Sequence, residues 1–547
     1  MSTDQNEFSE EQLGATTAYL LSEVKKRNIP YKRFHDSSLI TLGYGSRQKK
    51  LRTAVVDSTS GIGIEMAGDK EETKQILAHH RLPTPSGFLV YDENELRQAF
   101  SKMKLPIVTK PLDGNHGRGV TTHIDTFEKA LFGYNIAKKI SDAVIVEEFL
   151  EGDDHRFLVI DFKLVAVSKR TPAMVTGNGV STIAELVAQE NKHPDRGHQS
   201  IHVLAPIDID AITLKILGEL NLRLDSVIPE GKTLYLKDTA NISAGGTSTD
   251  LTDEVHPDNI FIAERVARIF NLNICGIDII TKDVSKSLIN GQGGIIEVNA
   301  GPGLRMHSNP TTGKARNVAA PIMDMLFPDH ISRIPVIAVV KSHDDDYTVK
   351  LLAQIMQQHG KCVGYTTSSA AFINNNKIAE IDYTNIADGE LILFDPMVDV
   401  AVLTCSRGSL AETRLPFDIC DIMLGLEISL DEMSALTEKI KPEGYIILDA
   451  DDNRVFSMIH ELPCKYAFIG TDKQNAHIIN HIEAGGLAVI SEQGQLNIYQ
   501  NNRENTVTMD SKNKHDNTQL IKSVMATVVS SIILNMDILK YQTKDLL

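Results

Sequence analysis

The stretch that decides the fold of this chain is Lys110-Pro111-Leu112-Asp113-Gly114-Asn115-His116-Gly117-Arg118-Gly119-Val120. A short apolar run, 105–108, precedes Lys110, and three glycines follow it within the loop. Glycines let backbone amides close around an anion because no Cβ stands in the way. A lysine at the end of an apolar run, followed by such a loop, indicates a site for phosphate groups.

A second stretch, Glu297-Val298-Asn299, ends another apolar run far downstream. Residues two apart on a strand share a face, so Glu297 and Asn299 are expected to point the same way. Asp278 is also acidic within an apolar run, where a charge has no packing value. The burial of such polar or charged groups costs free energy unless cations compensate them, and oxygen ligands are those that Mg²⁺ prefers. The sequence therefore predicts Asp278, Glu297 and Asn299 as metal ligands, with ATP and Mg²⁺ as cofactors.

A third stretch, 144–152, is an apolar strand that leads into a linker. Glu147, Glu148, Phe149 and Leu150 are predicted to frame the adenine and ribose of a nucleotide. The alternative is a buried strand with solvated glutamates.

The size and charge of the chain limit its class. At 547 residues the chain is too long to fold around one hydrophobic core, which predicts three or four domains. With 55 basic and 72 acidic residues the net charge is -17, which argues against nucleic-acid binding as the main function. The five cysteines are scattered and include no CxxC pair, so neither disulfides nor zinc are predicted.

No segment predicts export or membrane insertion. The first residues, 1–11, are polar and acidic without an apolar signal core. The longest apolar stretch, 524–536, contains serines and falls short of the ~20 residues that span a bilayer. A cytoplasmic protein with no membrane partner is expected.

Hydrophobic periodicity predicts an α/β protein. The expected helices are 16–26, 68–82 with Asp69 as its N-cap, 93–103, 126–140, 258–272, 347–359 and 519–541. The expected strands are 88–91, 107–110, 143–148, 157–160, 164–167, 276–280, 294–298, 336–340, 400–403, 445–448 and 466–469. The predicted domains are an N-terminal segment 1–67, a catalytic domain 68–330 with an insertion at about 172–250, a second α/β domain 331–497, and a polar connection with a C-terminal helix, 498–547.

The order of these motifs resembles the ATP-grasp ligases, and within them the cyanophycin synthetases. The resemblance runs from about residue 14 to about residue 490. It rests on Leu42-Gly43-Tyr44-Gly45, Gly68-Asp69-Lys70, the stretch Lys110 to Val120, Asn241 to Gly246, Asp253 to Asn259, and Glu297 to His307.

The resemblance implies an ATP-grasp unit followed by a Mur-ligase-like unit, and roles for individual residues. The implied catalytic residues are Lys110, His116, Arg156 and Arg305, and the implied substrate-binding residues are His116, Arg156, Ser243 and Gly245. The implied ATP-binding residues are Lys70, Lys110, Gly114, Asn115, Gly117, Arg118, Gly119, Glu147, Glu148, Phe149 and Leu150. From residue type alone, His116 is expected only to shape the loop, Arg156 to pair with Glu151 or Asp154, and Ser243 only to make a turn, but the motif matches favour the functional roles.

This chain departs from the family pattern in two places. Only a short segment precedes the matching region, so the family's N-terminal polymer-gripping domain is expected to be absent or replaced. In the second half, Lys341-Ser342-His343-Asp344-Asp345-Asp346 stands where a Gly-Thr-Asn-Gly-Lys-Thr loop is expected. Three carboxylates repel a triphosphate, so this half is expected to be catalytically inactive and to serve packing or assembly.

The resemblance is closest to the second type of cyanophycin synthetase, which has one active site. It implies a ligase that activates a C-terminal α-carboxylate as an acyl phosphate. The carboxyl carbon is then joined to the amine of β-aspartyl-arginine or aspartate, extending a polyaspartate-backbone polymer. A homodimer or homotetramer is expected. Two alternatives stay open: a ligase for a different amino acid or dipeptide polymer, and a non-catalytic scaffold for a full-length synthetase.

The second half is expected neither to bind nor to hydrolyse ATP, because repulsion by 344–346 replaces attraction. Isothermal titration of a Lys110→Ala/Glu297→Gln variant, which disables the first site, should detect no stoichiometric ATP binding. A site that survives in this variant, and is lost only when 341–346 are changed, would contradict the prediction.

Overall fold

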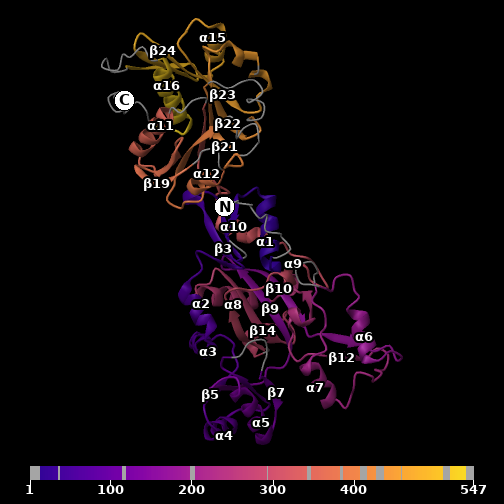
Figure 1. The fold of residues 1–547 in the computed structure, drawn as a ribbon. Coiled ribbons are helices and arrows are strands. Elements are labelled where there is room, and N and C mark those ends of the chain that lie inside the picture. The colour runs from indigo at the N-terminus through magenta and orange to yellow at the C-terminus, as the bar shows by residue number, and fades with distance from the viewer. Residues whose placement is uncertain are drawn as a thin grey trace. The chain divides into compact units, whose positions relative to one another are not determined.

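The chain divides into two compact units, shown as ribbons in Figure 1. The first unit comprises Met1–Asn28, Arg33–Ile40 and Lys49–His330, and the second comprises Ile29–Lys32, Thr41–Gln48 and Ile331–Leu547. The computed structural model describes residues 13–34, 37–113, 119–197, 204–291, 293–341, 346–381, 386–406, 415–426, 437–457, 459–508 and 518–536. Helices and sheets occur in both units, so the predicted α/β class is confirmed.

A five-stranded antiparallel sheet organises the first unit. In spatial order its strands are β13 (Thr247–Asp250), β10 (Lys163–Thr171), β9 (Asp153–Ile160), β14 (Ile274–Thr281) and β15 (Gly293–Asn299). Phe157 and Ile277 point to one face, where they share a buried core with Phe270 at the end of α8 (Pro257–Ile269). Because side chains alternate along a strand, Arg156 and Asp278 are placed on the opposite face.

A smaller sheet carries the predicted phosphate lysine. Its order is β5 (Gly87–Val90), β8 (Val144–Glu148), β6 (Ile107–Pro111) and β7 (Thr121–Ile124). The helices α4 (Glu93–Lys102) and α5 (Phe127–Lys138) pack against it, and side-chain oxygens of Asp92 and Thr126 accept hydrogen bonds from their first-turn amides. Lys110 therefore lies near the end of β6, as its apolar run predicts.

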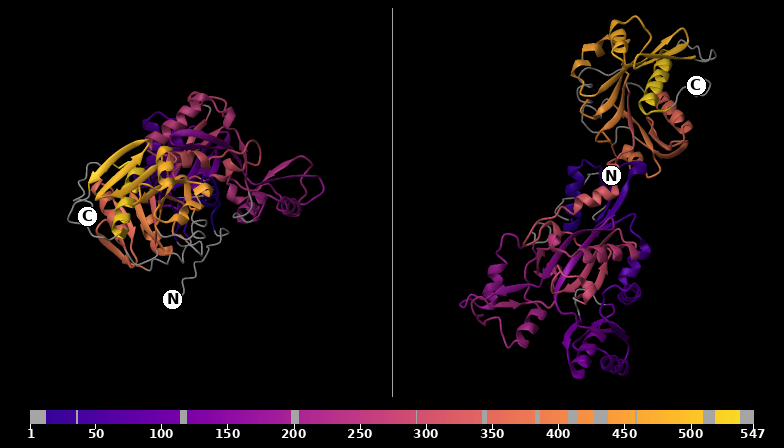
Figure 2. Two further views of the ribbon diagram at one scale, coloured as in Figure 1. Left: turned by 90° about the horizontal axis from the view of Figure 1, so that it is seen from above. Right: turned by 180° about the vertical axis from the view of Figure 1, so that it is seen from behind.

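The insertion forms a lobe with its own hydrophobic core, visible beside the central sheet in Figure 2. It contains β11 (Met174–Thr176), α6 (Ile183–Glu190), α7 (Ala211–Glu219), β12 (Thr233–Tyr235) and the short 3-10 helix η3 (Ile242–Ala244). The Arg196 guanidinium donates to the carbonyls of Ala205 and Gly245, each at 2.9 Å. This contact ties the lobe to the turn that begins at Asn241.

The first unit contains further helices and short strands outside these sheets and the insertion. They are α1 (Ala15–Lys26), β3 (Lys49–Arg52), β4 (Val55–Val56), α2 (Gly61–Gly68), α3 (Lys70–His79), η4 (Thr252–Glu254), η5 (Leu288–Asn290), α9 (Arg305–Ser308) and α10 (Ala319–Leu326). Asp69 caps α3 by accepting hydrogen bonds from the amides of Glu71 and Glu72, which confirms the predicted cap. Lys70 is thereby the first residue of this helix.

The second unit is built on one large sheet. In spatial order its strands are β19 (Asn376–Glu380), β18 (Ala370–Ile373), β17 (Val363–Thr366), β20 (Val400–Ser406), β16 (Val336–Lys341), β21 (Cys420–Gly425), β22 (Ile440–Asp449), β23 (Lys465–Gly470), β24 (Leu487–Glu492), β25 (Gln495–Gln500) and β26 (Arg503–Thr508). The strands from β17 to β24 are parallel. Val336 and Ala338 face one hydrophobic core and Ile337 and Val339 face another, so β16 is buried on both sides.

Helices cover both faces of this sheet. They are α11 (Tyr347–Gln358) and α16 (Thr518–Ile533), which pack on each other, with α12 (Ile386–Leu393) and α15 (Ala476–Glu483) contributing to the other core. The unit also contains β1 (Tyr31–Arg33, its last residue in the first unit), β2 (Leu39–Leu42, its first two residues in the first unit), η2 (Gly45–Arg47), η6 (Asn453–Ser457) and η7 (Ile459–Glu461).

The prediction of a polar connection from residue 498 is wrong for 498–508. These residues complete β25 and form β26, an antiparallel hairpin at the edge of the sheet. Leu496, Asn497 and Ile498 are buried, with Asn497 Oδ1 accepting a hydrogen bond from Thr506 Oγ1 of β26, and Asn501 and Asn502 adopt positive φ in the turn. Asparagine tolerates this conformation, so the polar, Asn-rich composition reflects an edge hairpin.

The C-terminal helix places a cation where β22 ends. Lys522 Nζ lies 2.6 Å from Asp449 Oδ2 and 3.2 Å from Asp451 Oδ2. The hydroxyls of Ser523 and Thr348 are 2.7 Å apart, which joins α16 to the first turn of α11. The carboxyl end of β22 is therefore filled by the chain's own lysine.

No helix among the described ranges is long and apolar enough to cross a membrane.

Candidate active site

A cavity of about 830 Å³ opens in the first unit between the two sheets and α3. The predicted site residues that line it are Lys70, Lys110, Glu147, Glu148, Phe149, Leu150, Arg156, Ser243, Asp278, Glu297, Asn299 and Arg305. Gly114, Asn115, His116, Gly117 and Arg118 lie outside the described residues. Residues spread over more than two hundred positions of sequence thus meet in one place.

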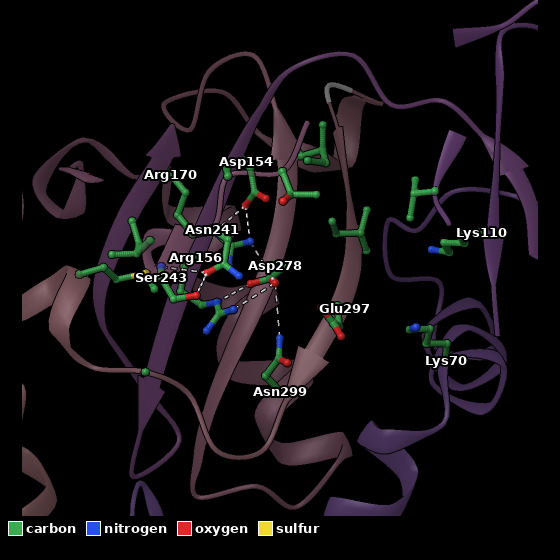
Figure 3. Close-up of a pocket in the computed structure, with 18 of the residues that line it drawn as sticks. Lys70, Lys110, Asp154, Arg156, Arg170, Asn241, Ser243, Asp278, Glu297 and Asn299 are labelled. Carbon is green, nitrogen blue, oxygen red and sulfur yellow. Dashed lines mark hydrogen bonds and ion pairs between the residues drawn. The ribbon is translucent and has the colours of Figure 1, made fainter. Parts of the chain in front are cut away.

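The cavity has two chemically different ends, which Figure 3 shows. Lys70 and Lys110 lie at one, here called the lysine end. Arg156, Arg170, Asn241 and Ser243 lie at the other, here called the arginine end. Asp278, Glu297 and Asn299 lie between them. One cavity therefore has room for a polyanion and for a second substrate beside it.

Asp278, which lies next to the arginine end, is more buried than the arginines that contact it, with 3% of the residue exposed. Arg156 donates to both of its carboxylate oxygens, and Arg170 Nη2 lies 3.0 Å from Oδ2. Burial would raise the pKa of Asp278, but the two guanidinium groups outweigh it and lower the pKa overall. Asp278 is therefore held ionised.

Asp154 shares Arg170 with Asp278, at 2.5 Å from Arg170 Nη2. Burial and the neighbouring Asp278 raise the pKa of Asp154 despite Arg170. Asp154 and Asp278 thus compete for the guanidinium of Arg170, so the charges of these groups depend on one another.

The predicted metal ligands lie on adjacent strands. Asp278 and Glu297 are paired in the register of β14 and β15, and Asn299 shares the face of Glu297. Asn299 Nδ2 also lies 3.4 Å from Asp278 Oδ2. Across the described ranges no three His, Cys, Asp or Glu side chains gather as a metal cluster. Two carboxylates and one carboxamide facing one cavity nevertheless fit a hard cation such as Mg²⁺.

Glu147 links the lysine end to the smaller sheet. Its carboxylate lies 2.5 Å from Lys110 Nζ and 3.1 Å from Lys74 Nζ. Burial would raise the pKa of Glu147, yet the two lysines more than offset it and the pKa is lowered. The alternative interpretation, in which Glu147 is a solvated glutamate, is wrong, because only 6% of the residue is exposed. Its role in framing adenine stays a prediction.

Lys70 faces the same region from the start of α3. Burial lowers the pKa of Lys70, and Lys110 lowers it further, while Glu297 raises it. Arg305, at the start of α9, has its pKa lowered by burial. Partly desolvated cations act strongly on an anionic ligand because little water screens them.

The structure also decides between several alternatives. Arg156 pairs with Asp278, whereas Glu151 pairs with Lys282, so the expected pairing of Arg156 with Glu151 or Asp154 is wrong. Ser243 does make a turn, because its amide and hydroxyl both donate to Asn241 Oδ1, and it lines the cavity as well.

Two predicted glycines occupy positions that other residues would strain. Gly119 has φ +75° and a Cβ there would lie 2.6 Å from Ile140 Cδ1. Gly245 has φ +92° and a Cβ there would lie 2.8 Å from Ile207 Cγ1. Both therefore shape the loops that border the cavity.

Sequence reasoning missed Lys74, Asp154 and Arg170. Lys74 follows Lys70 by four residues, so helical spacing offered a signal that both share a face of α3. Arg170 and Asp154 are paired in the register of β10 and β9. No local motif marks them, since strand pairing brings them together.

Comparisons with known proteins identify relatives of this chain. A family model described as a RimK-like ATP-grasp domain matches residues 67–177. A crystal structure of a bifunctional glutathione synthetase from Pasteurella multocida is 29% identical, with a TM-score of 0.47, and the match covers 58% of this chain and 45% of that one. Residues 67–177 of the first unit thus match the ATP-grasp family, which in general uses ATP and Mg²⁺.

Curated relatives match both units. Cyanophycin synthetase from Geminocystis herdmanii is 42% identical over 507 residues, which is 89% of this chain and 58% of that protein. Cyanophycin synthetase from a Nostoc species is 40% identical over 503 residues, covering 89% of this chain and 56% of that protein. The chain is thus related to the cyanophycin synthetases, as its motifs predict, and spans little more than half their length. The predicted fold class, an ATP-grasp unit followed by a Mur-ligase-like unit, is confirmed.

Arg170→Met should destabilise the first unit by about 2–4 kcal/mol, because Asp154 and Asp278 lose a shared buried partner. Lys169→Met is the matched control: it removes the same charge from the next residue of β10, where the ion pair with Asp153 is partly exposed. The control should cost less than about 1 kcal/mol. Chemical denaturation measures both, and equal losses would contradict the buried network.

Proposed function

We propose that this chain is an ATP-dependent carboxylate–amine ligase of the cyanophycin synthetase type. It would activate the C-terminal α-carboxylate of a polyaspartate-backbone peptide and join it to the amine of β-aspartyl-arginine or aspartate. The observation that carries the proposal is the single cavity with a lysine end, a set of oxygen ligands and an arginine end. Such a cavity suits the phosphates of ATP beside a carboxylate substrate.

The proposed chemistry has two steps. An oxygen of the peptide α-carboxylate attacks the γ-phosphorus of ATP, and ADP leaves. The amine nitrogen then attacks the carbonyl carbon of the acyl phosphate, inorganic phosphate leaves, and the nitrogen loses a proton to form the amide. Both steps develop negative charge on phosphate or carbonyl oxygens, so fixed cations stabilise their transition states.

The residues have separate roles in this proposal. Lys70 and Lys110 would hold the ATP phosphates, and Arg305 would stabilise the acyl phosphate. Asp278, Glu297 and Asn299 would hold Mg²⁺, which supplies charge neutralisation for the transferred phosphoryl group. Arg156 and Ser243 would bind the peptide at the arginine end. The resemblance implies His116 and Gly245 as further substrate-binding residues.

Two other functions are compatible with the family relationship. A ligase for a different amino acid or dipeptide would keep the same cavity, because substrate choice depends on the arginine end and the insertion. An ADP-release screen of β-aspartyl-arginine, aspartate, arginine and related dipeptides, with and without a polymer primer, distinguishes them. A non-catalytic scaffold would release no ADP with any of them.

Glu297→Gln should lower ADP production by about 100-fold or more while leaving the fold intact, because a metal ligand loses its charge. Glu230→Gln, at an exposed position of the insertion, is the matched control and should retain activity. Coupled ADP assays at saturating Mg²⁺ measure both variants. Turnover by Glu297→Gln at the rate of the unmodified protein would remove the metal assignment.

The second unit would serve assembly in this proposal, in a homodimer or homotetramer. Its apolar cores are retained, whereas the expected phosphate loop is replaced by acidic residues. Light scattering at micromolar concentration should give two or four times the monomer mass. A monomer at that concentration would contradict the assembly role of 336–490.

A further inference from the structure

Lys74, which belongs to none of the sequence motifs described above, forms an ion pair beside the lysine end of the cavity. Lys74 is buried beside Glu147, with 13% of its side chain exposed against 17% for Lys110 and 7% for Glu147. We propose that Lys74 is a positioning residue: it is the permanent counter-ion of Glu147, which leaves the Lys110 ammonium available to an ATP phosphate. This inference rests on the proposed function and adds to it a residue that acts through Glu147 and Lys110.

The structure provides a built site for the Lys74 ammonium. Gly87 on β5 is paired with Glu147 on β8. A Cβ at Gly87 would lie 2.5 Å from Lys74 Nζ, 2.5 Å from the carbonyl oxygen of Val146 and 2.8 Å from Glu147 Cβ. Real Cβ atoms do not approach other atoms this closely, so the absence of a side chain at Gly87 makes room for the ammonium between α3 and the sheet.

The charges explain why a second lysine is needed. A buried carboxylate with one ammonium forms a neutral pair, and that ammonium is poorly available to another anion. Glu147 instead has two close ammonium groups, Lys110 on Oε1 and Lys74 on Oε2. The cluster therefore carries one surplus positive charge. When Lys110 contacts a phosphate, Glu147 keeps Lys74 and is not left as a buried, unpaired anion facing that phosphate.

Removal of Lys74 should therefore weaken ATP binding without any loss of a direct contact. In Lys74→Met, Lys110 is the remaining close partner of Glu147, and the anion repels the incoming phosphate. The dissociation constant for ATP should rise by about tenfold or more. Affinity for the peptide acceptor should change little, since the arginine end is unaltered.

The experiment measures ATP binding by isothermal titration, without turnover, for the full chain and its variants. Lys129→Met is the matched control, because it removes a lysine with a 2.7 Å partner, Asp125, at the exposed surface of α5. It should bind ATP like the unmodified protein.

A double variant separates positioning from simple loss of structure. Lys74→Met/Glu147→Gln restores one surplus charge on Lys110 and leaves no unpaired carboxylate. It should bind ATP more tightly than Lys74→Met alone and should also unfold at a higher temperature. Weaker binding by the double variant than by Lys74→Met would overturn the inference, because Glu147 would then act as a ligand rather than as a competitor for Lys110.

The pH dependence gives a second signature. Glu147 is faced by Lys70 and Lys74 from α3 and by Lys110 from β6. Burial acts to raise its pKa and the lysines act to lower it, so the loss of Lys74 raises the pKa of Glu147. Protonation of Glu147 then releases Lys110. The dissociation constant for ATP of Lys74→Met, divided by that of the unmodified protein, should therefore be smaller at low pH than at high pH.

The outcomes distinguish this inference from the function on which it rests. If the unmodified protein does not bind ATP, the proposed ligase function fails and the inference fails with it. If it binds ATP and Lys74→Met binds equally well at both pH values, the ligase proposal stands and the positioning role is wrong. Weakened binding with recovery in the double variant and at low pH supports the role.

Discussion

The neutralisation of one buried carboxylate determines much of the first unit. Asp278 lies on β14, the strand between β9 and β15, and pairs in register with Arg156 on one side and Glu297 on the other. Arg170 reaches the same carboxylate from β10, two strands away. A one-residue slip of any of these strands would turn its charge into the hydrophobic core. The ion cluster therefore specifies the register that also aligns Glu297 and Asn299 along the cavity.

Part of this arrangement could be predicted from the sequence. Alternation along 294–298 predicts that Glu297 and Asn299 share a face, and both line the cavity. Lys110 lies on β6 where its apolar run places it. These features depend on neighbours in the chain. The pairing of Arg156 and Arg170 with Asp278 depends on the order of strands in the sheet. Local sequence patterns do not contain this order, so the partners expected for Arg156 from residue type were wrong.

The same limit explains why the sequence left the solvated alternative open at Glu147, and why the prediction for 498–508 is wrong. The sequence of β8 indicates an apolar strand but not that α3 and β6 each bring a lysine to it. Polar, Asn-rich residues are typical of mobile connections and equally of an edge hairpin with a turn of positive φ. The difference is the sheet edge at β24, to which β25 pairs. In both cases a tertiary partner decides what composition leaves open.

The two units differ in where their buried charges lie. In the first unit they line a cavity, whereas in the second unit a lysine of the chain itself neutralises the aspartates at the sheet edge. Replacement of buried ion pairs by apolar residues is often neutral or stabilising, so stability alone does not explain why a fold retains them. The first unit retains Asp278, Arg156, Arg170, Glu147 and Lys74 in or beside one cavity, as expected if their charges act on a ligand.

In the second unit the apolar residues of β16 still fill both cores, while Lys522 from α16 occupies the carboxyl end of β22. In open α/β sheets that edge is where ligands commonly bind. A cation supplied by the chain itself satisfies Asp449 and Asp451 without any ligand. The core of this sheet is therefore stabilised by strands that are buried on both faces, a stabilisation that needs no ligand at this edge.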